Sequence, residues 1–194
     1  MPQPDHPELT LEKLRQTASR IEKYVNLTPI HHWQDPWVVD QVGDGELYLK
    51  LEFLQQTGSF KARGALNNTL TRVKADRNQG VTAVSAGNHA IAVAYAAKTL
   101  GMSAKVLMHR KANPFRISKC QHYGAEVVLV DDITRAFALL EEIAESEDRI
   151  IIHPFDSAPT LQGTGTLGVE IGDALLNLDT ILVAVGGGGL IGGV

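Results

Sequence analysis

The beginning of the chain alternates apolar and charged residues in a helical rhythm. Within Leu9–Val25 the apolar positions are spaced as one face of a helix requires: Leu11, Leu14, Ile21 and Val25. Thr28-Pro29 should end this helix, because the residue before a proline avoids the helical conformation. Further on, Glu46–Phe53 alternates well enough to predict a strand.

From Val81 onward, short aliphatic runs alternate with helical segments. The runs predict strands at Val81–Ser85, Ala104–Met108, Glu126–Val130 and Arg149–His153. The segments between them predict helices at His89–Leu100, Pro114–Tyr123 and Ile133–Glu147. Strands that alternate with helices at this spacing predict an α/β fold with a parallel sheet between layers of helices. A further strand is expected at Asp179–Val185, directly before four consecutive glycines.

Composition narrows the class of protein. The 194 residues include 22 acidic and 18 basic side chains and carry a net charge of -4, which gives no basic surface for nucleic acid. No apolar run is long enough to span a bilayer, and the N-terminal residues lack the pattern of a secretory signal. Cys120 is the only cysteine, so no internal disulfide can form. We therefore expect a cytoplasmic protein that binds neither nucleic acid nor membranes.

Three segments carry chemical groups at positions where a site is expected. The first, Thr57–Ala65, places Lys61 after a glycine and an aromatic residue, at a predicted junction between loop and helix. A lysine attacks a carbonyl only as the neutral amine, so burial that lowers its pKa makes it a better nucleophile. The alternative is an ordinary lysine in the first turn of an amphipathic helix. This segment alone does not decide between the two.

The second segment, Ser85–Ala90, follows one predicted strand and begins the next helix. Ligands of open parallel sheets bind at the carboxyl ends of strands, and the N–H groups of a helix start attract a carboxylate or phosphate. The side chains of Ser85 and Asn88 would add polar contacts there. The alternative is that Asn88 only caps the helix and that His89 is a polar residue of the structure.

The third segment is the glycine run Gly186–Gly189. Glycines let the backbone approach an anion closely and direct several N–H groups at it, so a phosphate is the expected ligand. A flexible turn is one alternative. Another is the dinucleotide loop of a nicotinamide-dependent oxidoreductase, since residues 187–192 also match G-x-G-x-x-G. That motif normally has an acidic residue about twenty positions later, and the sequence ends before that position.

Together these segments resemble one enzyme family. Thr57–Ala65 is similar to the lysine motif of the fold-type-II pyridoxal-phosphate enzymes, the tryptophan synthase β-subunit superfamily. Ser85–Ala90 resembles the asparagine loop of its threonine and serine dehydratase branch, and Gly186–Leu190 resembles the phosphate loop of that branch. Four shorter segments also match in order and spacing: Thr28–Ile30, Lys50–Glu52, Gly124–Val128 and His153–Asp156. The resemblance extends from Ile21 to Val194.

The resemblance implies a role for each matching residue. Lys61 would bind the cofactor pyridoxal 5'-phosphate as a Schiff base and would later act as the base at the substrate Cα. Phe60 would pack beside the pyridine ring, and Asn88 would hydrogen-bond the 3-hydroxyl of the cofactor. The backbone of the glycine loop would bind the phosphate: Gly186, Gly187, Gly188, Gly189 and Leu190. The asparagine loop would hold the substrate carboxylate: Ser85, Gly87, Asn88 and His89. No metal ligand is expected among these residues.

The resemblance also implies the fold: an α/β protein with two parallel-sheet three-layer domains of the tryptophan synthase β type. Residues 81–153 would form the small domain, and residues 1–80 and 154–194 would form part of the large, cofactor-binding domain. Members of the family continue well past the glycine loop, so the large domain is expected to be incomplete in this chain. The chain alone is expected to be inactive and marginally stable, and the complete protein is expected to be a homo-oligomer.

The implied reaction is β-elimination, the dehydration and deamination of L-threonine or L-serine to a 2-oxo acid and ammonia. Serine racemase and 3-hydroxyaspartate dehydratase activities of the same family are alternatives, as is a non-catalytic fragment. A racemase needs a second acid–base group opposite Lys61, which in the racemases of this family is a serine directly before the glycine of the asparagine loop. This chain has Ala86 there, which has no exchangeable proton, so dehydration is favoured. Four other positions depart from the family pattern without a consequence that the sequence reveals: Ile91, His109, Arg116 and Thr164.

Overall fold

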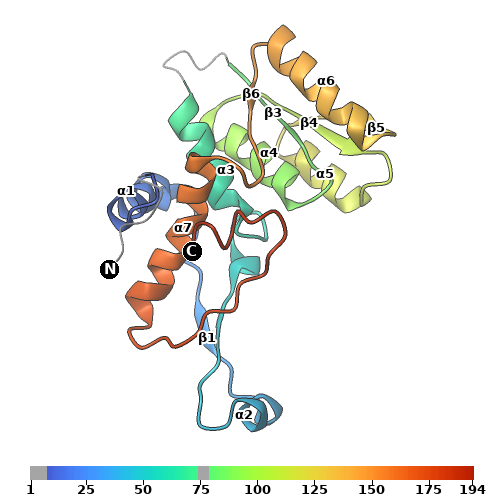
Figure 1. Ribbon diagram of the computed structural model, residues 1–194. Helices are drawn as coiled ribbons and strands as arrows, with labels where there is room; N and C mark the ends of the chain where they lie inside the picture. Colours follow the sequence, from blue (N-terminus) through green and yellow to red (C-terminus); the bar gives the residue numbers. More distant parts are fainter. Residues whose placement is uncertain (1–7, 74–78) are drawn as a thin grey trace.

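A parallel sheet forms the centre of the chain from residue 81 to residue 151. The computed structural model describes residues 8–73 and 79–194 (Figure 1). The strands of the sheet are β3 (Val81–Val84), β4 (Ala104–His109), β5 (Glu126–Val130) and β6 (Ile150–Ile151). Their spatial order is β5-β4-β3-β6, and every pairing is parallel. The parallel sheet predicted from the sequence is therefore confirmed.

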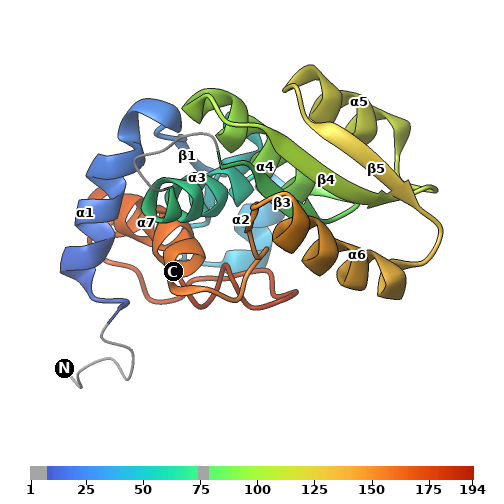
Figure 2. The same cartoon turned by 90° about the horizontal axis from the view of Figure 1, so that it is seen from above.

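Three helices cover this sheet: α4 (Asn88–Leu100), α5 (Pro114–His122) and α6 (Ile133–Ser146). α4 ends at Gly101, whose left-handed conformation (φ 69°) favours glycine. α5 and α6 begin after Asn113 and Asp132, whose side chains accept hydrogen bonds from backbone N–H groups of the first turn. Figure 2 shows α5 and α6 on opposite sides of the sheet. The helices therefore form the outer layers of a three-layer arrangement.

Alternating side chains of β4 divide the core into two layers. Val106 and Met108 belong to the larger apolar cluster, which includes the inner faces of α4 and α5. Leu107 lies in the second cluster, beneath α6. All three side chains are fully buried, because a parallel sheet covered on both faces must be apolar on both faces. The sheet thus gives a rigid support to the loops that follow its strands.

A second group of helices packs beside the sheet: α1 (Leu11–Ile21), α3 (Lys61–Arg72) and α7 (Ala158–Ala174). α3 packs against both α7 and α4, so it connects this group to the sheet (Figure 1). α3 and α7 cross at a pair of glycines. A Cβ atom on Gly163 would lie 2.7 Å from the Cα atom of Gly64. Only glycine permits this approach of two backbones, so the start of α3 is held closely against α7.

The remaining strands form a small separate sheet. β1 (Ile30–His32) and β2 (Tyr48–Lys50) pair antiparallel, and α2 (Pro36–Val42) connects them at the end that points away from the parallel sheet (Figure 1). Two short 3₁₀ helices complete the fold: η1 (Glu22–Tyr24) and η2 (Glu52–Leu54). Among the helices of residues 8–73 and 79–194, none combines the length and apolar character needed to cross a bilayer.

Several elements are shorter than the sequence pattern predicts. The first helix stops at Ile21 and continues as a 3₁₀ turn instead of reaching Val25 as an α-helix. The strand expected at Glu46–Phe53 is limited to Tyr48–Lys50, and the strand expected at Arg149–His153 is limited to β6. Each strand is limited to the residues that pair with a neighbour: β2 pairs with the three residues of β1, and β6 pairs with only the first two residues of β3.

The strand predicted at Asp179–Val185 is wrong. This segment has no regular secondary structure, and the side chains of Leu182 and Val185 are 88% and 64% exposed. A strand needs a neighbour for its backbone N–H and C=O groups. Neither sheet of the described residues places a strand beside this segment. A dinucleotide-binding loop directly follows a strand. The glycine run of this chain does not.

Candidate active site

Lys61 is the first residue of α3 and lies at the end of the loop Thr57–Phe60. Its Nζ atom donates a hydrogen bond to the carbonyl oxygen of Pro154 over 2.7 Å and lies 5.1 Å from the centre of the Phe60 ring. The side chain is half-buried, and burial lowers the pKa of its amine below the ordinary value of 10.5. Desolvation disfavours the charged form, so more of the amine is neutral and nucleophilic.

The asparagine loop lies where β3 ends and α4 begins. Asn88 is the first residue of α4 and its side chain is exposed, while no side chain caps the helix start. The Oγ atom of Ser85 accepts a hydrogen bond from the N–H of Gly87 over 3.1 Å. The hydroxyl of Ser85 is therefore turned toward its own loop. The first N–H groups of α4 have no partner within the helix, which leaves them able to bind an anion.

His89 takes a structural position. Its side chain is 4% exposed, and its Nε2 atom lies 2.8 Å from the carbonyl oxygen of Ile152. Burial, helped by the neighbouring charges of Lys61 and His153, lowers the pKa of the imidazole to about 4, although the hydrogen bond with the Ile152 carbonyl opposes this shift. Because its Nε2 atom is engaged with Ile152, the His89 ring is held against the segment after β6.

The glycine loop packs on the ring of Phe155. A Cβ atom on Gly187 would collide with that ring, and one on Gly189 would lie 2.6 Å from the Cβ atom of Phe155. Gly188 has φ +84°, a left-handed conformation that favours glycine. The Oγ1 atom of Thr164 lies 2.7 Å from the carbonyl oxygen of Gly189 and donates to it. α7 therefore holds the loop from one side and Phe155 holds it from the other.

One segment after β6 contacts all three motifs. We call Ile152–Phe155 the junction segment. The carbonyl of Ile152 binds His89, the carbonyl of Pro154 accepts from Lys61, and Phe155 supports the glycine loop. The sequence showed a match to a family motif here but gave no reason to expect this role, because carbonyl acceptors carry no sequence signal. The structure thus brings the lysine, the asparagine loop and the glycine loop to the same segment.

α5 contributes two cationic side chains that the motif analysis did not place in the site. Arg116 donates to the carbonyl of Ala86 in the asparagine loop over 3.3 Å. Lys119, one helical turn later, donates to the carbonyl of Thr57 in the lysine loop over 3.2 Å. Their spacing of three residues puts them on one face of α5, which is the only sequence signal that could have paired them. α5 therefore links the two loops.

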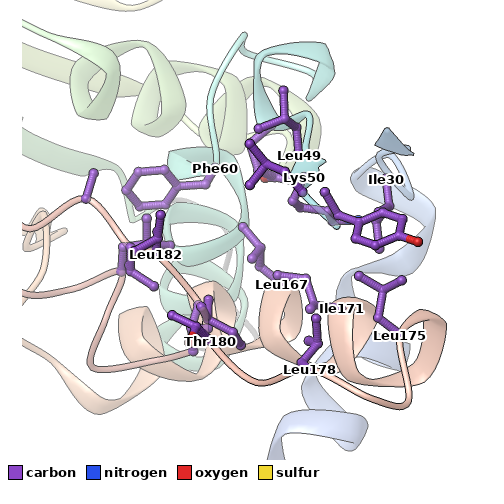
Figure 3. A pocket seen from close by; sticks show the side chains of 18 of the residues that line it. Ile30, Leu49, Lys50, Phe60, Leu167, Ile171, Leu175, Leu178, Thr180 and Leu182 are labelled. Atoms are coloured by element: carbon purple, nitrogen blue, oxygen red, sulfur yellow. The ribbon is translucent and has the colours of Figure 1, made fainter. Parts of the chain in front are cut away.

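A cavity of about 480 Å³ lies beside this site. Figure 3 shows its walls: β1 and β2 residues such as Ile30 and Leu49, α7 residues such as Leu167 and Ile171, and the segment after α7. Phe60 and Leu190 line it, whereas Lys61, the asparagine loop and the four glycines do not. Its walls are mainly aliphatic, and the one lysine among them, Lys50, is paired with Glu170. Lys61 therefore stays the candidate catalytic residue, and the cavity is a neighbouring, mainly apolar space.

The chain is similar to known proteins in sequence and in fold. The chain belongs to the pyridoxal-phosphate dependent enzyme family, whose sequence pattern matches residues 21–194. It is 44% identical over 176 residues to a phenylserine dehydratase of Ralstonia pickettii, an alignment that covers 91% of this chain and 53% of that protein. It is 39% identical over 187 residues to an L-threonine ammonia-lyase of Thermotoga maritima, covering 96% of this chain and 46% of that protein.

Solved structures agree with these relatives. Maize serine racemase superposes with a TM-score of 0.90 at 33% identity, over 96% of this chain and 56% of that one. The family and the α/β fold class predicted from the sequence are therefore confirmed. This chain spans about half the length of the relatives that it matches.

The residues present fit pyridoxal phosphate. Lys61 offers an amine of lowered pKa, and the glycine loop offers backbone that a side chain would obstruct. The hydroxyl of Ser59, two residues before Lys61, is buried and has no hydrogen-bond partner among the residues that the structure describes. A buried hydroxyl without a partner is costly, and a bound polar molecule would supply one. Lys61, Asn88 and the glycine loop would hold the cofactor.

Proposed function

We propose that the full-length protein removes water and ammonia from a β-hydroxy amino acid, L-threonine or L-serine, and releases a 2-oxo acid. The water lost in the elimination is taken up again when the enamine product hydrolyses, so the net products are the 2-oxo acid and ammonia. The junction segment carries this proposal, because it joins the half-buried Lys61 to the asparagine loop and the glycine loop. The names of two relatives, a phenylserine dehydratase and an L-threonine ammonia-lyase, support the reaction class.

Lys61 would act both as the anchor of the cofactor and as the base. When bound, pyridoxal phosphate supplies an electron sink for the bonds at the substrate Cα. Burial lowers the pKa of the Lys61 amine, which raises its neutral fraction near neutral pH. The carbonyl of Pro154 orients the Nζ atom. The amine can then accept the Cα proton at Nζ and return it to the leaving hydroxyl.

The two loops would bind and orient the ligands. In this proposal the N–H groups at the start of α4 and the side chain of Asn88 face the substrate carboxylate and the cofactor ring. Ser85 and Gly87 would shape the same loop through their hydrogen bond. The N–H groups of residues 186–190 would bind the phosphate, and Phe60 would pack beside the ring. The N–H groups would bind negatively charged groups, the carboxylate and the phosphate, and Phe60 would contact an aromatic ring.

Lys61→Ala in the full-length protein tests the proposal. We expect it to abolish both the visible absorbance band of the lysine-bound cofactor and 2-oxo acid formation from L-threonine. Lys98→Ala is the matched control, because Lys98 lies exposed on α4 and should leave both signals unchanged. A Lys61→Ala protein that keeps the band and the turnover would refute the assignment.

A racemase is the second candidate, favoured by the close superposition with maize serine racemase. Racemization needs a proton donor on the face opposite Lys61. Ala86 has no such proton, and the hydroxyl of Ser85 is bonded to the N–H of Gly87. These two observations favour elimination, and the Ala86 variant described below separates the candidates.

We also propose the wider organisation that the family resemblance implies. Residues 81–153 would form a small domain and residues 1–80 and 154–194 part of a larger one. This division agrees with the parallel sheet, whose strands all lie between residues 81 and 151. Limited proteolysis of the full-length protein that cuts between the two parts, and leaves both resistant, would support it. Homo-oligomerisation and a cytoplasmic location remain proposals of the same kind.

A further inference from the structure

A fully buried arginine lies two residues after Lys61. The side chain of Arg63 is 0% exposed. Its Nε and Nη2 atoms donate to the two carboxylate oxygens of Glu52 over 2.9 Å each. Its Nη1 and Nη2 atoms donate to the two oxygens of Glu170 over 2.6 Å and 2.9 Å. Both carboxylates are thus bound in the bidentate geometry that the guanidinium fork favours.

The charges around Arg63 are balanced. A second cation, Lys50, lies 2.5 Å from the Oε2 atom of Glu170, and its Nζ atom also donates to the carbonyl of Thr28. Thr28 donates to Glu52 in turn. Burial alone would lower the pKa of Arg63, but its hydrogen bonds to Glu52 and Glu170 outweigh this effect, so the pKa is raised. The two cations and the two carboxylates of the cluster therefore balance in formal charge.

This cluster joins separate parts of the chain at the first turn of α3. Glu52 comes from η2, Glu170 from α7, Lys50 from β2 and Thr28 from the loop before β1. Arg63 also donates to the hydroxyl of Thr166 on α7 over 3.1 Å. Each bond of Arg63 acts on the helical turn that begins with Lys61. The rotation and depth of that turn are therefore fixed from several directions.

Stability alone does not require such a cluster. Apolar residues of similar volume often stabilise a buried site as well as an ion pair does. What the guanidinium adds is direction, since its planar fork donates to carboxylates in a rigid bidentate geometry. A lysine at the same position would supply the charge without that geometry. The cost of burying four charges is understandable if the orientation of the first turn of α3 matters for chemistry.

We propose that Arg63 is a positioning residue for Lys61, because its bonds to Glu52 and Glu170 set the orientation in which the Lys61 amine reaches the carbonyl of Pro154. The inference rests on the proposed role of Lys61 as the cofactor-binding amine. Arg63 itself touches neither Lys61 nor Pro154 and acts through the backbone of α3.

The test compares three variants of the full-length protein. Arg63→Lys keeps the charge and loses the fork. Thr166→Val removes one bond to Arg63 and keeps both carboxylates, so it provides a milder change if Arg63→Lys does not fold. Arg15→Lys is the matched control, because Arg15 makes a bidentate pair with Asp173 between α1 and α7 on the surface.

Two measurements are made on each protein. The first is the pKa of the Lys61 amine in the cofactor-free protein, from NMR of 13C-methylated lysines assigned with Lys61→Arg. The second is the rate at which the absorbance band of the lysine-bound cofactor appears on addition of pyridoxal phosphate. Circular dichroism checks that each variant is folded.

We expect Arg63→Lys to raise the Lys61 pKa toward its ordinary value of 10.5 and to slow band formation roughly 10-fold or more. Thr166→Val should move both in the same direction by less, and Arg15→Lys should match the unmodified protein. The inference is overturned if Arg63→Lys lowers only the melting temperature and leaves both measurements at control values. If Arg63→Lys does not fold, the same outcome for Thr166→Val overturns it. An unmodified protein that never gains the band would instead refute the proposed function, and the pKa comparison would still decide the role of Arg63.

Discussion

Replacing glycine by alanine is expected to change the stability of the protein in opposite directions at two positions of α7. A Cβ atom on Gly163 would lie 2.7 Å from the Cα atom of Gly64 and 2.8 Å from the carbonyl carbon of Arg63. These are backbone atoms and cannot move aside without shifting α3. A Cβ atom on Gly172 would meet nothing within 4 Å, and this residue is exposed. Gly163→Ala should therefore destabilise the protein, and Gly172→Ala should stabilise it.

The magnitudes follow from packing and helix propensity. Overpacking a tight interface costs roughly 1–3 kcal/mol, and contact with backbone places Gly163→Ala toward the upper end. Alanine gains up to about 1 kcal/mol over glycine inside a helix, which reduces the net loss at position 163 to about 2 kcal/mol. At position 172 only the gain applies. The two variants should differ by roughly 3 kcal/mol in free energy of unfolding.

Urea unfolding of the two variants, followed by circular dichroism, measures this difference. Because both changes are Gly→Ala in one helix, effects on the unfolded chain cancel to a first approximation. The midpoint for Gly163→Ala should fall below that of the unmodified protein and the midpoint for Gly172→Ala should rise above it. Equal shifts of the same sign would mean that α3 and α7 do not meet through their glycines.

Three further predictions concern the site. Gly188→Ala should weaken the affinity for pyridoxal phosphate, measured by fluorescence titration, because φ +84° strains any side chain; an unchanged affinity would place the phosphate elsewhere. Ala86→Ser should raise racemization of L-serine relative to elimination, measured by chiral chromatography and 2-oxo acid formation. Efficient D-serine production before the change would show that another residue supplies the second proton.

The third prediction is a pH effect. His89 has a folded-state pKa of about 4, against 6.5 for the unfolded chain, so only the unfolded state binds the proton between these values. Stability should fall by roughly 3 kcal/mol as the pH falls from 6.5 to 4. The melting temperature of His89→Gln should fall less across that pH range than that of the unmodified protein. An equal fall in both proteins would mean that His89 is not the group responsible.

The sequence predicted the parallel sheet well because its strands are short, apolar and separated by clear helix signals. Glu126–Val130 is reproduced without change, and Gly101 ends α4 as expected. The prediction was wrong for Asp179–Val185, whose aliphatic residues describe a strand only when a neighbouring strand is present. Whether a segment forms a strand depends on the neighbouring strand with which it pairs as well as on its own residues.

The sequence named the parts of the candidate site but not how they come together. Lys61, Asn88 and the glycine loop were singled out by local motifs, and only the resemblance to a family gave them roles, which remain predictions. The carbonyl of Pro154 and the ring of Phe155 carry none, since their role depends on which segments meet in space. His89 shows the converse, because a polar residue inside a motif is bonded by its ring to the carbonyl of Ile152.

The position of the junction segment has a consequence for protein synthesis. β6 is the last strand of the parallel sheet and ends at residue 151, so a nascent chain leaving the ribosome can complete the sheet before residue 154 emerges. The bond between Lys61 and Pro154 spans 93 residues, and such distant contacts close late in folding. Thr164 and Gly189, which secure the glycine loop, emerge later still. The sheet that supports the candidate site can therefore fold before the Lys61 amine meets its acceptor at Pro154.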